Sequence, residues 1–268
     1  MRALALDFDG VISDSAREAF EVALRTFARL RPAARLAARA AHPATEAQPE
    51  LFAAFLDLMP LGNRAEDYGV ALAALEAGAT LPDQAAYDAF HAAQDPAWLR
   101  AFHERFYAER ADFAERDHDR WLARMAPYAP FVATLRRRAG DAVLAIATSK
   151  DHRSVSELLG AFGLADLFDP RWILDKEAGV SKRAHLERLA AGLRLPFKEI
   201  TFLDDKVNHL ESVAPLGVRC ALAAWGYNGD RERNRARALG FLVCRLEDAE
   251  AQLFGSAPAR TPGAAALP

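Results

Sequence analysis

The 268-residue sequence contains little cysteine and no long apolar run, and each shortage excludes a class of protein. Its two cysteines, Cys220 and Cys244, lie in separate apolar segments typical of strands. A disulfide framework and a zinc site of clustered cysteines are therefore excluded, and we expect two buried, reduced thiols. No segment reaches the roughly 18 consecutive apolar residues that a membrane-spanning helix needs. Asp7 and Asp9 interrupt the first apolar run, so the N-terminus does not resemble a signal peptide.

Charge of one sign is not in excess either. Lys and Arg number 34 and Asp and Glu 37, which gives a formal net charge of −3. No net positive field therefore favours nucleic acid or an acidic membrane surface as a partner. The 7 histidines show no recognisable metal-ligand spacing. We expect a cytoplasmic enzyme or binding protein, monomeric or homodimeric, that binds neither nucleic acid nor membrane.

Short apolar segments typical of buried strands are present, and helical patterns separate several of them. The segments are residues 2–7, 142–149, 171–174, 199–205, 218–225 and 241–245. Apolar residues at helical spacing follow in "RSVSELLGAFGL" and in "SKRAHLERLAAGL". Strands that alternate with helices predict an α/β fold with a parallel, Rossmann-like sheet covered on both faces.

Residues 16–125 differ from the rest of the chain in composition. They are rich in Ala, Leu and Arg and show no convincing strand pattern, which predicts an all-helical domain inserted between the first and second strands. The expected α/β core is then residues 1–15 and 126–254. Residues 31–50 are the least patterned part of the insert, and we expect a loop or a strained helix pair there. The small-residue tail, 255–268, is expected to be disordered.

Polar side chains collect at the expected ends of three strands. They are Asp7 and Asp9 after the first strand, Thr148 and Ser149 after the second, and Asp204 and Asp205 after the fourth. In open parallel sheets, ligands bind beyond the carboxyl ends of the strands. Four carboxylates meeting there would repel one another unless a divalent cation lay among them, and Mg²⁺ prefers oxygen ligands of this kind.

Several other residues fit the chemistry of a phosphate ligand. Lys182 stands at the expected start of a helix, where it could offset the carboxylate charge and attract phosphate oxygens. Lys176 in "LDKEAG" is a rival for this role. Thr148 and Ser149 could donate hydrogen bonds to a phosphoryl oxygen, and Gly10 lets the chain turn tightly close to a ligand.

Taken in chain order, the polar segments at the strand ends and Lys182 resemble the four motifs of the haloacid dehalogenase (HAD) superfamily of aspartate-nucleophile phosphotransferases. "DFDGVISDS" is similar to the first motif, "ATS" at 147–149 to the second, Lys182 to the third and "LDD" at 203–205 to the fourth. The likeness covers the core, about residues 1–15 and 126–250. It implies a phosphatase-like member with Mg²⁺ as cofactor, whose insert is a helical cap of the C1 type.

The resemblance also implies a role for each core residue. Asp7 would be the nucleophile and form an aspartyl-phosphate, while its other oxygen binds Mg²⁺. Asp9 would act as general acid and then general base, with its main-chain carbonyl on the metal. Thr148 and Lys182 would hold the phosphoryl group, whose transfer depends mostly on positioning and charge stabilisation.

Metal ligation by the fourth motif is less well specified. Asp205 is the first choice for the metal ligand, with Asp204 as a helper. Many members of the superfamily carry a further acid four residues after the metal-binding Asp, where this chain has His209. Asn208 and His209 are therefore both candidates for an outer partner of the metal site.

The presence of the second acid, Asp9, favours phosphate-ester chemistry over the other reactions of the superfamily. Dehalogenases of the superfamily lack this acid and need no metal, and phosphonate hydrolases have a small residue in its place. We therefore expect hydrolysis of a small phosphorylated metabolite, a phosphomonoester. A sugar-phosphate phosphomutase shares every core residue named above and is the alternative enzyme. A catalytically silent binding protein on the same fold is the third reading, although such a relative would be expected to have lost at least one of these residues.

Within the insert, one segment offers candidates for substrate recognition. "DLMPLGNRAEDYGV" at 57–70 breaks a helix and then presents compact polar residues. Arg64 could bind a carboxylate or a second phosphate bidentately. The alternative for the same segment is an ordinary solvated helix N-terminus.

Overall fold

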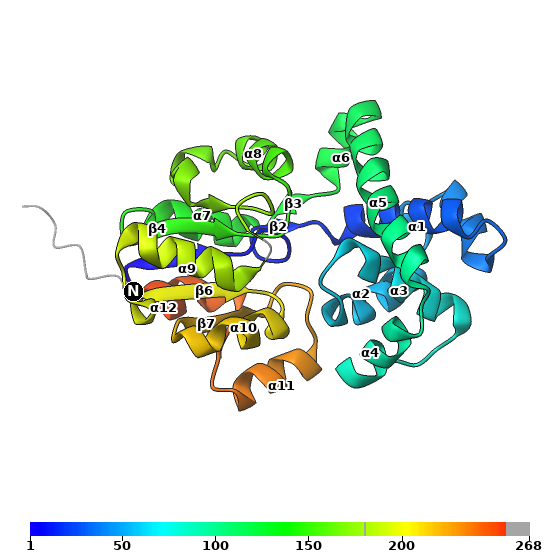
Figure 1. Cartoon of the computed structure of the whole chain (residues 1–268). Helices are drawn as coiled ribbons and strands as arrows, with labels where there is room; N and C mark the ends of the chain where they lie inside the picture. Colours follow the sequence, from blue (N-terminus) through cyan, green and yellow to red (C-terminus); the bar gives the residue numbers. More distant parts are fainter. Residues whose placement is uncertain (180, 256–268) are drawn as a thin grey trace, which may run out of the picture. The chain divides into compact units, whose positions relative to one another are not determined.

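Each apolar segment named above contains one strand of a parallel sheet in the computed structural model (Figure 1), which describes residues 1–179 and 181–255. Within the described residues the sheet has six strands in the order β5-β4-β1-β6-β7-β8. All neighbouring strands run parallel. The strands are β1 (Ala3–Leu6), β4 (Val143–Ala147), β5 (Ile173–Leu174), β6 (Ile200–Asp204), β7 (Arg219–Ala223) and β8 (Leu242–Cys244). The predicted α/β, Rossmann-like fold is confirmed.

The central strand β1 is buried on both faces. Ala5 belongs to one core cluster with Leu186 of α9 (Lys182–Leu193). Leu6 is equally buried, and it points to the opposite face because successive side chains of a strand alternate. Burial on both faces explains why these strands appear in the sequence as continuous apolar runs.

The chain divides into two units, each described by itself. The α/β unit comprises residues 1–12 and 128–225 and continues from residue 236, and the helical unit comprises residues 13–127 and 226–235. Nothing in the composition of the sequence indicates that 226–235 groups with the helical unit. Of the expected tail, residues 256–268 lie outside the described residues.

Helices flank the sheet of the α/β unit, where α9 packs against α10 and α7 against α12. Besides α9, they are α7 (Ala129–Arg138), α8 (His152–Ala161), α10 (Val207–Val213) and α12 (Ala249–Phe254), while α11 (Asp230–Ala238) begins within the segment 226–235. Both cysteines are buried and unbridged, as predicted.

The helical unit is built around α1, which packs against α3 and α5. Its α-helices are α1 (Ala16–Leu30), α2 (Pro49–Leu58), α3 (Ala65–Ala77), α4 (Gln84–Ala92), α5 (Pro96–Arg116) and α6 (His118–Ala123). The poorly patterned stretch 31–50 contains two 3₁₀ helices, η1 (Arg35–Ala41) and η2 (Thr45–Ala47). Two-residue strands, β2 (Ser13–Asp14) and β3 (Ala126–Pro127), pair antiparallel where the chain enters and leaves this unit.

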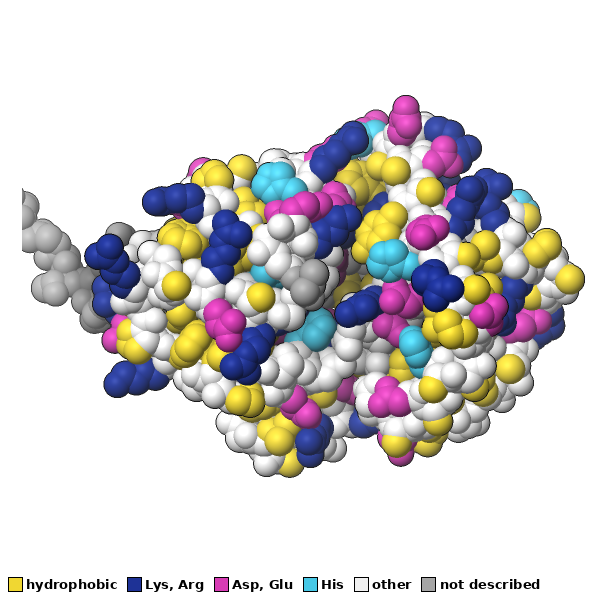
Figure 2. Space-filling view, viewed as in Figure 1, with side chains coloured by type: hydrophobic (Ala, Val, Ile, Leu, Met, Phe, Trp, Pro, Cys, Tyr) yellow, Lys and Arg dark blue, Asp and Glu magenta, His cyan; other side chains and the backbone are white. Residues whose placement is uncertain are grey.

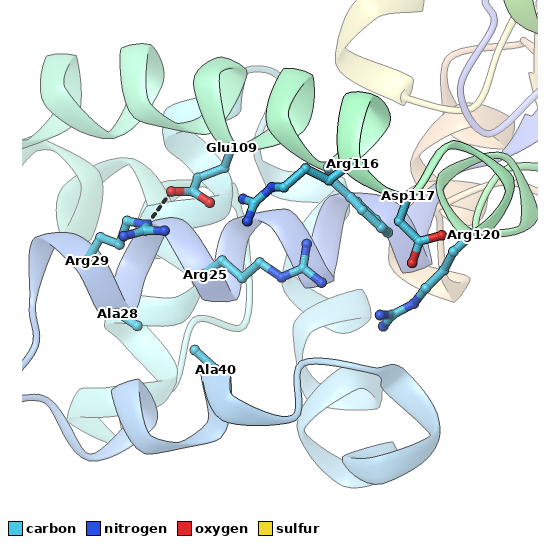
Figure 3. Close-up of a pocket in the computed structure, with 9 residues that line it drawn as sticks. Arg25, Ala28, Arg29, Ala40, Glu109, Arg116, Asp117 and Arg120 are labelled. Carbon is cyan, nitrogen blue, oxygen red and sulfur yellow. Dashed lines mark ion pairs between the residues drawn. The ribbon is translucent and has the colours of Figure 1, made fainter.

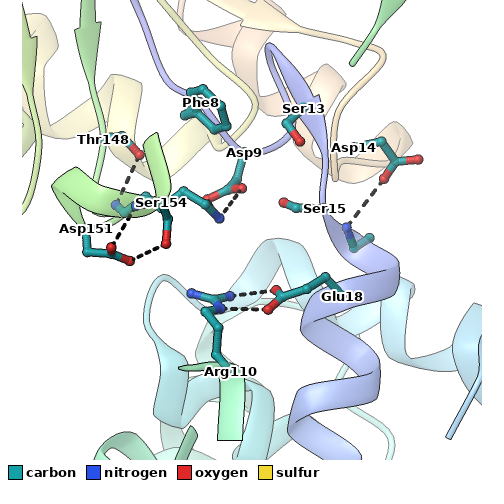
Figure 4. Close-up of polar contacts among 12 residues, drawn as sticks. Phe8, Asp9, Ser13, Asp14, Ser15, Glu18, Arg110, Thr148, Asp151 and Ser154 are labelled. Carbon is teal, nitrogen blue, oxygen red and sulfur yellow. Dashed lines mark hydrogen bonds and ion pairs between the residues drawn. The ribbon is translucent and has the colours of Figure 1, made fainter. Parts of the chain in front are cut away.

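Buried ion pairs also hold the helical unit together. Glu18 of α1 is fully buried and accepts hydrogen bonds from Nε and Nη2 of Arg110 on α5, at 2.7 and 2.8 Å (Figure 4). Arg110 lies over the ring of Phe106, 4.7 Å from its centroid. The pair therefore joins two helices through a bidentate contact with an aromatic support.

On the surface, Figure 2 shows acidic and basic side chains interspersed over the face in view, in keeping with the nearly balanced charge of the sequence. Among the described residues, no helix combines the length and apolar character that crossing a membrane requires.

Candidate active site

Asp7 lies directly after β1, at the carboxyl end of the central strand. Its Oδ1 accepts a hydrogen bond from the main-chain N–H of Phe8 at 2.7 Å, and its Oδ2 lies 2.7 Å from Nζ of Lys182. The residue is only 7% exposed. The end of the strand therefore fixes a nearly buried carboxylate with one oxygen against a cation.

Lys182 is the first residue of α9, whose N-terminus is capped by the side chain of Ser181. Its Nζ donates to the carbonyl of Ala147 at 2.7 Å and lies 3.4 Å from Oδ2 of Asp204. Burial opposes the charge, but Asp7 and Asp204 together raise the pKa of the Lys182 ammonium above its ordinary value. The lysine is therefore charged, and it links the ends of three strands.

The rival lysine, Lys176, has a different environment. Its side chain is exposed, whereas Lys182 is buried against Asp7. The structure brings Lys182 into the acidic cluster, at the helix start where the sequence motif places it.

Asp204 is the last residue of β6 and is fully buried. Nδ1 of His209 lies 3.0 and 3.1 Å from its two oxygens, and the main-chain N–H of Lys206 donates to it at 2.9 Å. Burial favours the protonated form, yet His209 and Lys182 hold the pKa of Asp204 below its ordinary range. Asp204 is therefore an ionised carboxylate whose side-chain partners come from α9 and α10.

Burial has the opposite outcome at Asp7. It raises the pKa of the Asp7 carboxyl, the charge of Lys182 only partly offsets this, and the negative charge of Asp204 raises the pKa further. A single ammonium thus serves two buried carboxylates. Additional positive charge beside Asp7 would favour its ionised form.

Gly10 brings the loop after β1 against Asp205. Its backbone has φ = +76°, and a Cβ atom at this position would lie 2.3 Å from Oδ2 of Asp205. Both the positive φ and the lack of space therefore require glycine. Asp205 is 1% exposed, so its carboxylate is packed against the turn that follows Asp9.

Asp9 and the end of β4 are joined by a lysine. Nζ of Lys150 lies 3.0 and 3.3 Å from the two oxygens of Asp9, and the main-chain N–H of Lys150 donates to Oγ1 of Thr148 at 3.2 Å. Thr148 and Lys150 are buried, whereas Ser149 between them is exposed. No role was predicted for Lys150, and its place two residues after Thr148 is the signal that could have identified it.

The acidic residues fit a hard divalent cation. One ligand atom each of Asp7, Asp204 and His209 lies within 4.8 Å of the others. The carboxylate of Asp205 lies against the neighbouring turn at Gly10. Carboxylate oxygens dominate this set, and such oxygens are the ligands that Mg²⁺ prefers.

Arg64 belongs to the helical unit. It precedes α3, and its main-chain N–H donates to Oδ2 of Asp67 at 2.9 Å, while its side chain is exposed. This geometry is that of a helix N-terminus stabilised by a nearby acid. A role for Arg64 in substrate binding stays a prediction.

Comparison with known proteins shows which family model the sequence matches. Residues 1–217 match the family model described as haloacid dehalogenase-like hydrolase. A human protein named magnesium-dependent phosphatase 1 is 31% identical over 152 residues, which cover 56% of this chain and 82% of that protein.

Solved structures show the same fold at lower sequence identity. A predicted phosphoglycolate phosphatase from Haemophilus somnus has a TM-score of 0.62 at 17% identity, covering 92% of this chain and 96% of its own. A conserved haloacid dehalogenase-like protein from Agrobacterium tumefaciens has a TM-score of 0.58 at 16% identity, covering 94% and 97%.

Proposed function

Because the chain belongs to the haloacid dehalogenase-like hydrolases, we propose that it is a Mg²⁺-dependent phosphatase that hydrolyses a small phosphomonoester through an aspartyl-phosphate. The observation that carries the proposal is the buried Asp7, oriented by the N–H of Phe8 and paired with Lys182. The name of the human relative supports the reaction and the metal.

Asp7 is the nucleophile in this proposal. A bond forms between one of its carboxylate oxygens and phosphorus while the bond from phosphorus to the ester oxygen breaks. Lys182 and Thr148 hold the phosphoryl oxygens, and Ser149 and the main chain at Gly10 complete the cradle. Positioning and charge stabilisation supply most of the catalysis in such a transfer.

Asp9 moves the protons. It protonates the departing ester oxygen, and in the second half-reaction it takes a proton from the water that attacks the aspartyl-phosphate. The ion pair with Lys150 at 3.0 Å supports this role, because it holds the Asp9 carboxylate in one place.

Mg²⁺ would be held by Asp7, by Asp205 and by the main-chain carbonyl of Asp9. When bound, the cation neutralises negative charge on the phosphoryl oxygens. The packing of Asp205 against Gly10 supports its choice as ligand. Asp204 would act as a helper, since it already pairs with a lysine and a histidine.

The insert would serve as a C1-type cap, with core residues 1–15 and 126–254 and cap residues 16–125. A cap of this kind excludes water from the reaction and selects the substrate. Arg64 would then bind a carboxylate or a second phosphate of that substrate.

The test is phosphate release from a broad panel of phosphorylated metabolites, with Mg²⁺ and with EDTA. Asp7→Asn is compared with Asp57→Asn, which removes an exposed carboxylate from α2. We expect metal-dependent turnover that is lost in Asp7→Asn and retained in Asp57→Asn. If the folded wild-type protein released phosphate from no ester in Mg²⁺, or if Asp7→Asn kept full activity, the proposal would be wrong.

A further inference from the structure

A hollow of about 500 Å³ in the helical unit is lined by arginines from opposite sides. Arg25 and Arg29 come from α1, Arg116 from the end of α5 and Arg120 from α6 (Figure 3). All the residues that line the hollow belong to the helical unit. The proposed reaction uses none of them, so the hollow requires a separate explanation.

An aromatic ring lines the hollow beside two of the arginines. Phe113 of α5 is buried, and the guanidinium of Arg25 lies 4.5 Å from its ring centroid. Arg120 lies 5.6 Å from the same centroid. Stacking on an aromatic face limits the motion of a guanidinium without neutralising its charge. Two positive groups are therefore held in place at the hollow.

One buried carboxylate is shared by three of the surrounding arginines. Glu21 of α1 is fully buried, and its oxygens lie 3.6 Å from Arg25, 3.1 Å from Arg120 and 2.8 Å from Arg124. Arg124 has a second acidic partner in Glu46, 2.7 Å away. The two arginines that line the hollow, Arg25 and Arg120, therefore share the single carboxylate of Glu21.

A second buried carboxylate beside the hollow is shared in the same way. Glu109, also buried, forms ion pairs with both Arg29 and Arg105. Arg116 pairs with Asp112 along α5. Four arginines and two acids, Glu109 and Asp117, line the hollow. Glu21 and Asp112 pair with lining arginines without lining the hollow themselves.

The mutual repulsion of the arginines is visible at Arg25. Burial lowers the pKa of the Arg25 guanidinium most, Glu21 and Glu109 raise it, and the charges of Arg120 and Arg116 lower it. Added negative charge in the hollow would relieve this repulsion.

We propose that the hollow binds a small multivalent anion. Guanidinium groups bind phosphate and carboxylate through paired hydrogen bonds, and groups on two walls can hold two anionic centres at once. A volume of about 500 Å³ accommodates a molecule larger than a single phosphate. Polyphosphates and polycarboxylates are the two sources of this chemistry. The proposal does not depend on the phosphatase activity.

The test is calorimetric titration of tripolyphosphate and, separately, of citrate into the full chain at low salt without Mg²⁺. The double variant Arg116→Gln/Arg120→Gln removes side chains that are 66% and 40% exposed. It leaves Glu21 paired with Arg25 and Arg124. The matched control is Arg100→Gln, an exposed arginine of the same α5 that does not line the hollow.

We expect saturable binding of at least one probe, weakened by about tenfold or more in the double variant and unchanged in Arg100→Gln. The probe that binds more tightly then identifies the class of anion. Equal binding by all three proteins would place the probe elsewhere on the molecule and overturn the proposal, as would absence of saturable binding to the wild type. If the double variant does not fold, Arg116→Gln alone provides the same comparison.

Discussion

The two units of the molecule both bury carboxylates against cations, but they do so with different geometry. In the α/β unit, Asp7 and Asp204 lie at strand ends and share the single ammonium of Lys182. In the helical unit, Glu18 lies within α1 and receives two parallel hydrogen bonds from Arg110. In the first arrangement two carboxylates share one ammonium, with His209 as a further partner of Asp204, and the second pairs one carboxylate with one guanidinium.

This difference separates a candidate site from a structural contact. A bidentate arginine satisfies both oxygens of its partner, so the pair joins helices and has little capacity left for a ligand. Because Asp7 is buried and shares its lysine with Asp204, the charge of Asp7 is incompletely neutralised and its pKa is raised, which an added cation could correct. Burial of charge alone therefore does not indicate chemistry, whereas incomplete neutralisation at converging strand ends does.

The strongest test of this comparison replaces one buried carboxylate of each unit, Asp7 or Glu18, by its amide. Asp7→Asn should reduce phosphate release by about 10³-fold or more, because the nucleophile is removed, with stability unchanged or increased. Glu18→Gln should lower the free energy of unfolding by about 3 kcal/mol, because it leaves Arg110 without its buried partner charge. Urea unfolding and phosphate release are measured on both variants. Wild-type stability in Glu18→Gln would contradict the structural assignment.

A control for this prediction replaces the whole pair. In Glu18→Leu/Arg110→Met both charges are lost together, and the buried space is filled by apolar side chains. Replacing both members of a buried ion pair is often close to neutral for stability. We therefore expect the double variant to recover most of the stability that Glu18→Gln loses.

The next test separates the two neighbouring acids of the α/β unit. Asp205→Asn should raise the Mg²⁺ concentration for half-maximal activity by about tenfold or more, because a ligand is weakened. Asp204→Asn should instead lower kcat at saturating Mg²⁺, since Asp204 holds Lys182. Activity is measured across a Mg²⁺ titration for both. If Asp204→Asn rather than Asp205→Asn raised the Mg²⁺ requirement, the metal would be assigned to the cluster of Asp7, Asp204 and His209.

The smallest effect concerns the thiols, which both lie in the α/β unit. Burial raises the pKa of Cys220 to about 11 and that of Cys244 to about 12. A pH of 8 lies below both pKa values, so both thiols are protonated in the native protein. We therefore expect them to react slowly with a disulfide reagent in the native protein and rapidly after unfolding. If Glu18→Gln destabilises the helical unit alone, the labelling rate should stay at its wild-type value; a large increase would show that the two units open together.

The sheet could be predicted because its determinants are local. Buried parallel strands are continuous apolar runs, and a carboxylate such as Asp7 directly after one is conspicuous. The tight turn at Gly10 was also predicted from a local signal, a glycine that closely follows the strand. The predicted strand boundaries extended beyond the observed ones because strand ends depend on pairing with neighbours.

Other features of the site depend on contacts between distant residues. The ion pair of Lys150 with Asp9 and the contact of His209 with Asp204 follow from how the strand ends converge. Neighbouring residues at a strand end point in different directions, so the sequence alone does not distinguish Asp204 from Asp205. The grouping of residues 226–235 with the helical unit likewise depends on tertiary packing.

The pairing of β2 with β3 has a consequence for how the insert could be replaced. Ser13 lies opposite Pro127 and Asp14 opposite Ala126, so an excursion of more than a hundred residues departs and returns at adjacent points. Its two ends are as close as those of a short hairpin, and the entropy of closing a loop rises only slowly with its length. Such a junction accepts a replacement of almost any size without altering the strands of the sheet. The helical insert of this hydrolase could therefore be exchanged or redesigned independently of the sheet.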